Sequence, residues 1–462
     1  MNMKRLLCLI LATILSLLCC SCAGKNNETS DDVQLTYWYH AEQYDEMVDV
    51  IQRYNRWCTS HSTDDMKIRL VEFEDYNTMS QRLNIEVMSG GGPDLFSNYM
   101  NLPFEKLMQN GAFRDLNPLI ESDPSPDRII LNDYNQTIMD AAVFDGKRYG
   151  IPAFYTVDTL VGQNNVFEKY KMPTEQGYHL TFDNMDEVFS AFLQEPDGYY
   201  FWNDQSGYSG ANTDLLILKL IGSRVDFDTK STSFDEDFKH KLQTLMTLKE
   251  HSAAPSADQA DFPFSEDIIP CLFSDYGSFS NPIWMERMWG SSDEDDFDTS
   301  QPVFYSCFEK DENTYSAEIR LALFVNVNTK KDEKVLSFIK YLIGEHLQKL
   351  YAGSEDEYWS GWGDDSLPVL NSAYESCVRT AYNTTDEYGE KNGVKAALSP
   401  VTQALLTYHE NINSVSLYPA PQYSYYIRNI VLPILQDYRD GKIDLNKCAD
   451  RLSSATRIYI EE

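Results

Sequence analysis

Aromatic and short polar side chains follow several predicted strands of this chain, where a sheet would run out into its loops. Flat aromatic rings can cover the C–H faces of a sugar, and nearby carboxylates, amides and hydroxyls can exchange hydrogen bonds with its hydroxyl groups. We expect these side chains to bind a ligand without making or breaking a covalent bond. The candidate ligand-binding residues are Tyr39, Glu42, Asn98, Tyr99, Tyr155, Asp158, Tyr276, Trp284, Trp359, Trp362 and Tyr425.

The alternative for each candidate is an ordinary structural role. The chain contains 30 tyrosines, and any single tyrosine is more often a packing residue than a platform for a ligand. Glu42 and Asp158 are acidic residues of a kind that more often lies on a solvated surface. Trp359 and Trp362 are the strongest candidates, because a tryptophan pair among glycines and acids (EYWSGWG) has little predicted core around it.

Motifs for covalent chemistry are weak or missing. The seven histidines form no HExxH pair, and no Gly-Lys-Ser/Thr string is present to cradle a phosphate. Gly207–Gly210 (GYSG) lacks the spacing of a nucleophile elbow. We therefore expect no catalytic residue, no metal site and no cofactor. A surface-anchored carbohydrate-active enzyme remains the alternative, because 72 acidic residues can always include two carboxylates that flank a glycosidic bond.

The elements that would position the candidate residues alternate between strand and helix. Val33–His40 and Lys67–Phe73 are predicted strands, and Asp94–Phe96 begins a third after the helix breakers Gly90–Pro93. Asp75 is a predicted N-cap. This order is typical of a parallel sheet covered by helices, which binds ligands at the carboxyl ends of its strands. The predicted helix faces carry Tyr44, Met47, Ile51, Tyr54 and Cys58, and then Met79, Leu83 and Val87.

The first residues resemble a bacterial lipoprotein signal. Lys4 and Arg5 precede the apolar run Leu6–Leu18, which is too short to span a bilayer but suits an export signal. We expect residues 1–21 to be removed, Cys22 to carry the lipid, and residues 22–32 to form a flexible tether. Cys20 is the alternative lipid site, because Cys19 stands where the usual motif prefers leucine. An ordinary secretory signal is the other alternative.

Charge and cysteine content exclude further classes of protein. The formal net charge of −34 repels the backbones of nucleic acids, so we expect no nucleic-acid partner. Beyond the leader, an odd set of dispersed cysteines favours neither a disulfide framework nor a zinc cluster, and we expect most of them to be buried thiols. These cysteines are Cys58, Cys271, Cys307, Cys377 and Cys448.

Five segments, taken in order, resemble one family of proteins. Each segment alone is a weak match, but the five keep the family's order and compatible gaps over nearly the whole mature chain. They resemble the bacterial extracellular solute-binding protein family 1, the substrate-binding proteins of ABC importers that include the maltose-binding protein. The segments are Ser89–Phe96 (SGGGPDLF), Gly111–Ile120, Asp145–Pro152 with Asn164–Pro173, Ile319–Asn328 with the helix that carries Val335, Phe338, Ile339, Leu342 and Leu347, and Gly441–Ile460 with Asp444 as a possible cap.

The resemblance implies an α/β fold of the periplasmic-binding-protein-like type II, a clamshell of two α/β lobes joined by a hinge. Lobe I would comprise residues 33–150 plus 319–363, and lobe II residues 151–318 plus 364–462. Ile151–Val157 would form one hinge, and closure of the lobes would bury the ligand.

The resemblance also implies a function and partners. The chain would be a monomer, tethered by lipid to the outer face of the bacterial cell membrane. It would capture a sugar or oligosaccharide and deliver it to the permease subunits of an ABC importer. A ligand-binding component of a signalling receptor is the alternative that keeps the same fold.

Overall fold

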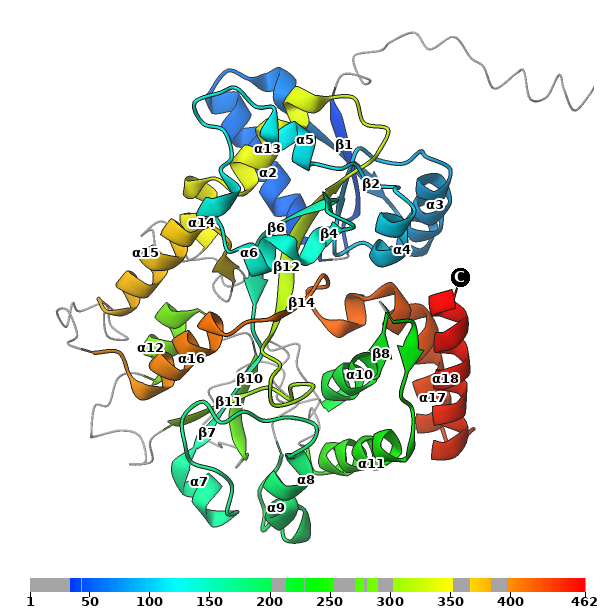
Figure 1. Ribbon diagram of the computed structural model, residues 1–462, viewed down its shortest axis with the longest axis vertical. Helices are drawn as coiled ribbons and strands as arrows, with labels where there is room; N and C mark the ends of the chain where they lie inside the picture. Colours follow the sequence, from blue (N-terminus) through cyan, green and yellow to red (C-terminus); the bar gives the residue numbers. More distant parts are fainter. Residues whose placement is uncertain are drawn as a thin grey trace, which may run out of the picture.

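The computed structural model describes residues 34–42, 44–201, 213–227, 229–252, 271–277, 281–289, 302–351, 366–383 and 397–461. These residues form a mixed α/β structure with two large hydrophobic cores, one in the upper part and one in the lower part of Figure 1. The upper part is built on a sheet with the strand order β13-β6-β12-β3-β1-β2, and β14 pairs with β12. Its strands are β1 Leu35–His40, β2 Ile68–Phe73, β3 Leu95–Ser97, β6 Gly150–Thr156, β12 Ser316–Val325, β13 Leu367–Pro368 and β14 Ser414–Ser416.

The first three strands confirm the predicted strand–helix alternation. β2 and β3 both run parallel to β1, and β12 runs antiparallel to β3 and β6. The predicted cap at Asp75 is confirmed, because its carboxylate accepts a hydrogen bond from the Thr78 N–H at 2.7 Å. Asp45 caps the preceding helix in the same way, through the Met47 N–H at 3.1 Å. These caps place the helix N-termini beside the carboxyl ends of β1 and β2.

Helices cover both faces of this sheet in Figure 1. One predicted helix is two helices in the structure: α13 carries Val335 to Leu342 and α14 carries Leu347. Gly344 separates them, and a Cβ atom there would meet the carbonyl oxygen of Lys340. The principal helices of this part are α2 Glu46–Ser60, α3 Tyr76–Met88, α4 Phe104–Gln109, α5 Asn117–Glu121, α6 Gln136–Met139, α13 Asp332–Leu342, α14 Glu345–Tyr351, α15 Asn371–Ala381 and α16 Pro400–Glu410.

The lower part packs helices against a small antiparallel sheet with the order β10-β7-β11. Its strands are β7 Thr159–Gln163, β10 Phe273–Gly277 and β11 Pro302–Ser306. Its main helices are α7 Asn164–Lys169, α8 Met185–Val188, α9 Ser190–Gln194, α10 Thr213–Ser223, α11 Glu236–Glu250, α17 Leu432–Arg439 and α18 Leu445–Glu461, and α12 Pro282–Trp289 packs on α15 and α16. The predicted cap at Asp444 is confirmed by a 2.8 Å hydrogen bond from the Lys447 N–H.

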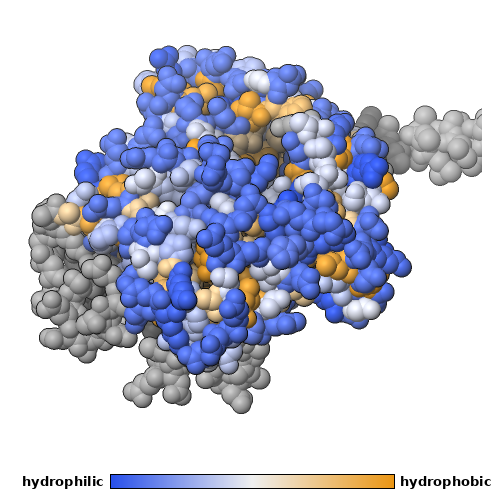
Figure 2. Space-filling view, turned by 60° about the horizontal axis from the view of Figure 1, so that its bottom comes forward, coloured by the Kyte–Doolittle hydropathy of each residue, from blue (hydrophilic) through white to orange (hydrophobic). Residues whose placement is uncertain are grey.

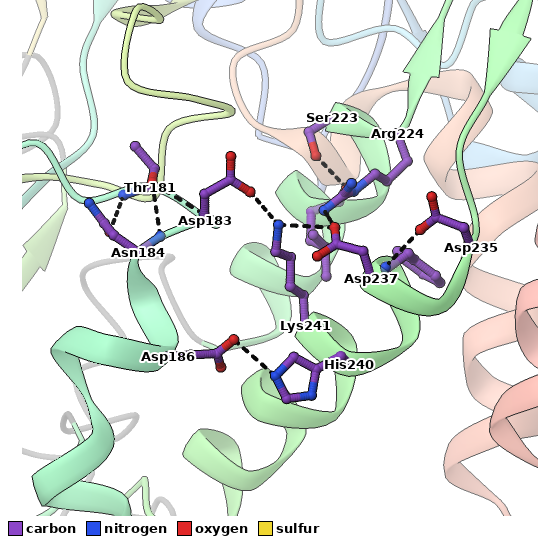
Figure 3. Close-up of polar contacts among 12 residues, drawn as sticks. Thr181, Asp183, Asn184, Asp186, Ser223, Arg224, Asp235, Asp237, His240 and Lys241 are labelled. Carbon is purple, nitrogen blue, oxygen red and sulfur yellow. Dashed lines mark hydrogen bonds and ion pairs between the residues drawn. The ribbon is translucent and has the colours of Figure 1, made fainter.

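Ion pairs join three helices of the lower part (Figure 3). Lys241 on α11 is buried and contacts Asp183, which precedes α8, and also Asp237 at 3.0 Å. Arg224, which directly follows α10, reaches Asp237 at 2.9 Å. Burial opposes ionisation of Asp237, but Lys241 and Arg224 outweigh it and lower the pKa of this carboxyl. Two cations therefore hold one carboxylate, which ties the start of α11 to its neighbours.

The two cores divide the chain differently from the expected lobe boundaries. The first core takes residues mainly from 35–157, 317–369 and 401–418, and the second from 160–308 and 426–460. Residues 151–157, 367–369 and 401–418 thus pack in the first core, although the expected boundaries assign them to lobe II. The reason is strand pairing, because β6 lies between β12 and β13 in the main sheet.

The surface is largely polar, and the cysteines are not paired. Figure 2 shows hydrophilic residues over most of one face, with hydrophobic residues in scattered patches. Cys58, Cys307, Cys377 and Cys448 are free and buried, and Cys271 is free and half-buried, which confirms the expectation for most of them. Within the described ranges, no helix is both long enough and apolar enough to cross a bilayer.

Candidate functional site

Three tyrosine rings meet beside the carboxyl ends of β1 and β3. Tyr44 packs edge-on against Tyr99, with ring centroids 5.7 Å apart, and Tyr99 packs edge-on against Tyr423 at 5.3 Å. Tyr99 is buried, whereas Tyr44 is 40% exposed and Tyr423 is half-buried. We call Tyr44, Tyr99 and Tyr423 the tyrosine cluster. It presents aromatic surface to solvent at the end of the sheet where open α/β folds bind ligands.

A buried ion pair lies under the tyrosine cluster. Arg320 on β12 donates from Nε to Oε2 of Glu46 at 3.3 Å, and the Tyr99 hydroxyl donates to the same oxygen at 3.2 Å. Burial raises the pKa of Glu46, although Arg320 opposes this shift. Tyr99 and Glu46 raise the pKa of Arg320 against the effect of its own burial. The cluster therefore rests on a cation and a carboxyl that can both form hydrogen bonds.

A second arginine lies on the other side of Tyr423. Arg428 donates from Nη1 to the Tyr76 hydroxyl at 2.5 Å, and its guanidinium carbon lies 5.7 Å from the Tyr76 ring centroid and 5.9 Å from that of Tyr423. His40, at the end of β1, lies edge-on to Tyr76 with centroids 6.3 Å apart. Arg428 lies in a π-helical turn, Ile427–Val431, whose Ile427 and Val431 pack in the second core, and Tyr76 begins α3. Groups from both parts of the molecule therefore meet here.

A buried polar network supports the strand ends below the cluster. The Tyr37 hydroxyl contacts Asp45, and the Ser97 hydroxyl donates to the same carboxyl at 3.3 Å. Burial raises the pKa of Asp45 to about 6, although its hydrogen bonds to Tyr37, Met47 and Ser97 work in the opposite direction. Because one carboxyl caps α2 and also ties β1 to β3, the network fixes the loop that carries Tyr44.

A second ion pair, between Lys219 and Asp158, lies near Glu318 on β12, the strand that also carries Arg320. Lys219 on α10 is bound to Asp158 at 2.8 Å and to the carbonyl oxygen of Cys307 at 3.0 Å. Glu318, two residues before Arg320 on β12, is buried; burial and then Asp158 raise its pKa well above the ordinary value. Burial opposes the charge on Lys219, but Asp158 raises its pKa. The ion pair gives Asp158 a structural role.

Asn98 and Tyr155, two predicted ligand contacts, lie inside the first core. The Asn98 amide donates to the carbonyl oxygens of Ile319 at 2.6 Å and Leu417 at 2.9 Å, and accepts from the Ala322 N–H at 2.9 Å. Its hydrogen bonds therefore tie the end of β3 to β12 and to the segment that follows β14. Tyr155 is 2% exposed within β6, so its ring packs instead of facing solvent.

The remaining predicted residues are spread over the molecule. Tyr39 is half-buried, and its hydroxyl donates to Glu72 at 3.1 Å; Tyr425 stacks on Tyr459 with centroids 6.3 Å apart. Glu42 is exposed, and Trp284 is half-buried on α12. Tyr276 lies on β10. Trp359, Trp362 and Cys22 lie outside the described residues. Of the predicted residues that the structure describes, only Tyr99 belongs to the tyrosine cluster.

The sequence prediction omits most residues that meet at this site. Tyr423 lies in the aromatic segment Pro419–Tyr426, which also offers Tyr425. The prediction that Tyr44 lies on a helix face is wrong, because α2 begins at Glu46 and Tyr44 is 40% exposed before it. Arg320 and Arg428 give no local signal, because their partners Glu46 and Tyr76 lie far away in the sequence.

A separate hollow of about 350 Å³ lies on the outer side of the first part. Its lining comes from α2, α13 and α14, which all belong to the first part. Because all of its lining residues belong to the first part, whereas groups from both parts meet at the tyrosine cluster, we place the candidate site at the cluster. The lining residues are Arg53, Arg56, Trp57, Ser60, Tyr341, His346 and Leu350.

Comparisons with solved structures identify the fold. An ABC substrate-binding protein from Listeria monocytogenes in complex with cycloalternan is similar, with 12% identity over 93% of this chain and 99% of that chain, and a TM-score of 0.55. A chitin oligosaccharide binding protein has 13% identity over 93% and 100%, and a TM-score of 0.56. An ABC transporter solute-binding protein from Agrobacterium vitis S4 with bound D-mannitol has 15% identity over 93% and 98%, and a TM-score of 0.54.

No family model matches the chain, and no curated protein sequence matches it. At these identities the likeness shows the fold alone, which is the two-lobe, periplasmic-binding-protein-like α/β fold. The fold class predicted from the sequence is confirmed.

Proposed function

We propose that the chain is a solute-binding protein of family 1 that captures a carbohydrate. Aromatic and charged side chains from both parts of the molecule would contact this ligand. The observation that carries this proposal is the meeting of Tyr99 from the first core with Tyr423 and Arg428 from the closing segment of the chain. The similar proteins of known structure are a complex with cycloalternan, a chitin oligosaccharide binding protein and a protein with bound D-mannitol. The ligand is an oligosaccharide, which an ABC permease receives from the closed protein.

The chemistry of the site suits a polyhydroxylated ring. The half-exposed faces of Tyr44 and Tyr423 can pack on sugar C–H groups, and the half-buried Arg320 guanidinium can donate hydrogen bonds to hydroxyls. Glu42, Tyr39, Tyr276, Trp284, Trp359, Trp362 and Tyr425 stay predictions as further contacts.

Titration calorimetry with a panel of trisaccharides tests ligand capture. We expect at least one saccharide to bind, and Tyr423→Ala to weaken that binding about tenfold or more, because a stacking face is lost. Tyr200→Ala is the matched control, since Tyr200 is 42% exposed and lies in the second part, where its backbone pairs with Cys271. Equal affinity in wild type and Tyr423→Ala would remove the tyrosine cluster from the binding site.

We also propose that the ligand leaves unaltered. Asp158 raises the pKa of the buried Glu318, so these two carboxyls are the pair that we compare with a hydrolytic pair. Asp158, however, is held in an ion pair by Lys219. Incubation of the protein with the same saccharides, followed by an assay for reducing ends, should show no product above the buffer blank. Steady product formation that Glu318→Gln abolishes would establish the enzyme alternative.

Anchoring through Cys22 completes the proposal. Cells that express the full chain and are fed labelled palmitate should label the protein, and Cys22→Ala should abolish the label whereas Cys20→Ala should not, because only the cysteine after the cleavage point is acylated. Label that persists in Cys22→Ala and disappears in Cys20→Ala would move the anchor to Cys20. Label in neither wild type nor variant would leave an ordinary secretory signal.

A further inference from the structure

We propose that Arg428 makes the candidate site selective for oligosaccharides that carry carboxylates, that is, for uronic-acid saccharides. This inference rests on the proposed function, because it assigns a chemical class to the ligand of the same site. It goes further in requiring a negative charge on that ligand.

The first argument is charge pairing. The chain has 72 acidic and 38 basic residues, so carboxylates are abundant partners for any cation. The other two cations of the site are paired in this way, Arg320 with Glu46 and Lys219 with Asp158. Within the described parts of the chain, Arg428 forms no ion pair, and its guanidinium contacts the tyrosines Tyr76 and Tyr423. Its charge is therefore left for an anion from outside the chain.

The second argument is geometry. A guanidinium has five N–H donors in a planar fork, and the Tyr76 hydroxyl accepts from Nη1 of Arg428. The rings of Tyr76 and Tyr423 lie near the guanidinium and limit its movement. Arg428 is half-buried, so part of its fork is open to solvent. A carboxylate matches the spacing of two such donors and binds guanidinium in a bidentate manner.

The third argument is the backbone that carries Arg428. The turn Ile427–Val431 is π-helical, a conformation that is rare and is frequent at functional sites. Pro433, which has no backbone N–H to donate, follows within α17. The turn also places Asn429 within 3.1 Å of Asn101 in the first part. Arg428 thus projects from the second part toward Tyr76 of the first, beside the aromatic rings that would contact sugar.

The simpler alternative is that Arg428 only joins the two parts through Tyr76. In that case its loss would change the affinity for charged and neutral saccharides by the same factor. A carboxylate-binding role would change the affinity for charged saccharides alone. A matched pair of ligands that differ only in charge separates the two roles.

The probes are three uronate trisaccharides, built from galacturonate, mannuronate and glucuronate, and their methyl esters, which are neutral. Titration calorimetry on the full mature chain should show that wild type binds at least one acid more tightly than its ester. Arg428→Gln should weaken binding of that acid by about ten- to a hundredfold, the range for a hydrogen bond between charged groups, and change binding of the ester by less than about threefold. Arg428→Lys should give an intermediate loss, because lysine keeps the charge without the fork.

Arg82→Gln is the matched control. Arg82 also lies over an aromatic ring, 4.9 Å from the Trp38 centroid, and its removal changes the net charge equally, but it is paired with Glu86 on α3. We expect it to leave every affinity unchanged. Tight binding of neutral saccharides without preference for any acid, or equal losses for acid and ester in Arg428→Gln, would overturn the carboxylate selectivity and leave the proposed function intact. Binding of neither acidic nor neutral saccharides would overturn both.

Discussion

At the scale of single residues, neighbours with the same sequence signal have opposite roles. Asn98 and Tyr99 both follow β3 and are both predicted ligand contacts. The Asn98 amide is used by three backbone partners from two other segments, whereas Tyr99 joins the tyrosine cluster. A polar residue after a strand serves equally well to satisfy backbone groups of a neighbouring segment. Sequence shows the residue type but not which segment will lie opposite.

His409 gives a prediction about pH at this scale. It is buried on α16, its Nδ1 lies 2.9 Å from the Tyr374 hydroxyl, and Nε2 has no hydrogen-bond partner among the described residues. Burial lowers its pKa to about 3. Below about pH 6.5 the unfolded chain therefore binds a proton that the folded chain does not, so stability falls with decreasing pH.

We expect His409→Asn to remove this part of the pH dependence, because the amide can still reach Tyr374 but does not titrate. Between about pH 6 and pH 4, the free energy of unfolding should depend less steeply on pH in the variant, by up to about 1.4 kcal/mol per pH unit. Urea unfolding of both proteins over this range measures the two slopes. Parallel slopes would show that His409 is protonated in the folded state or remains neutral in the unfolded one.

At the scale of elements, local patterns predict the first strands and helices well. β1, α2, β2, α3 and β3 occur where periodicity and breakers place them, and Asp75 and Asp444 are the predicted caps. The break at Gly344 and the π-helical turn at Arg428 are not predicted. Both depend on how neighbouring elements pack, and this information is distant in the sequence.

Two glycines test the packing of elements in the lower part. A Cβ atom on Gly162 in β7 would lie 2.6 Å from the carbonyl oxygen of Leu272 and would also meet the ring of Phe167. Gly162→Ala should therefore destabilise the protein by about 1–3 kcal/mol, the cost of overpacking a core.

Gly222 is the matched control on α10, where an added Cβ meets nothing within 4 Å. Gly222→Ala should be neutral or stabilising by up to about 1 kcal/mol, because alanine loses less backbone entropy in a helix. Chemical denaturation of both variants gives the comparison. Equal free energies of unfolding in the two variants would mean that β7 and its neighbours can rearrange around the added Cβ atom without loss of stability.

At the scale of the whole molecule, the ordered set of motifs predicts the fold, but core packing sets the limits of the two parts. The fold class is confirmed by the similar solved structures. The expected boundary at residue 150 falls inside the main sheet, because β6 continues from 150 to 156 and pairs with β12 and β13. The sequence cannot show this pairing, because more than 150 residues separate β6 from β12 and more than 40 separate β12 from β13. The three strands meet only in the folded protein.

The central position of β12 bears on the order in which the sheet can form during synthesis of the chain. β12 lies between β6 and β3, so the sheet of the first part stays in two pieces until residue 325 has left the ribosome. The same core also needs residues up to 418, and the second needs the final helix. Contacts between such distant segments form slowly. A nascent chain built in this order stays open for most of its synthesis, a state that passage through a secretion channel would require if the predicted export signal is used.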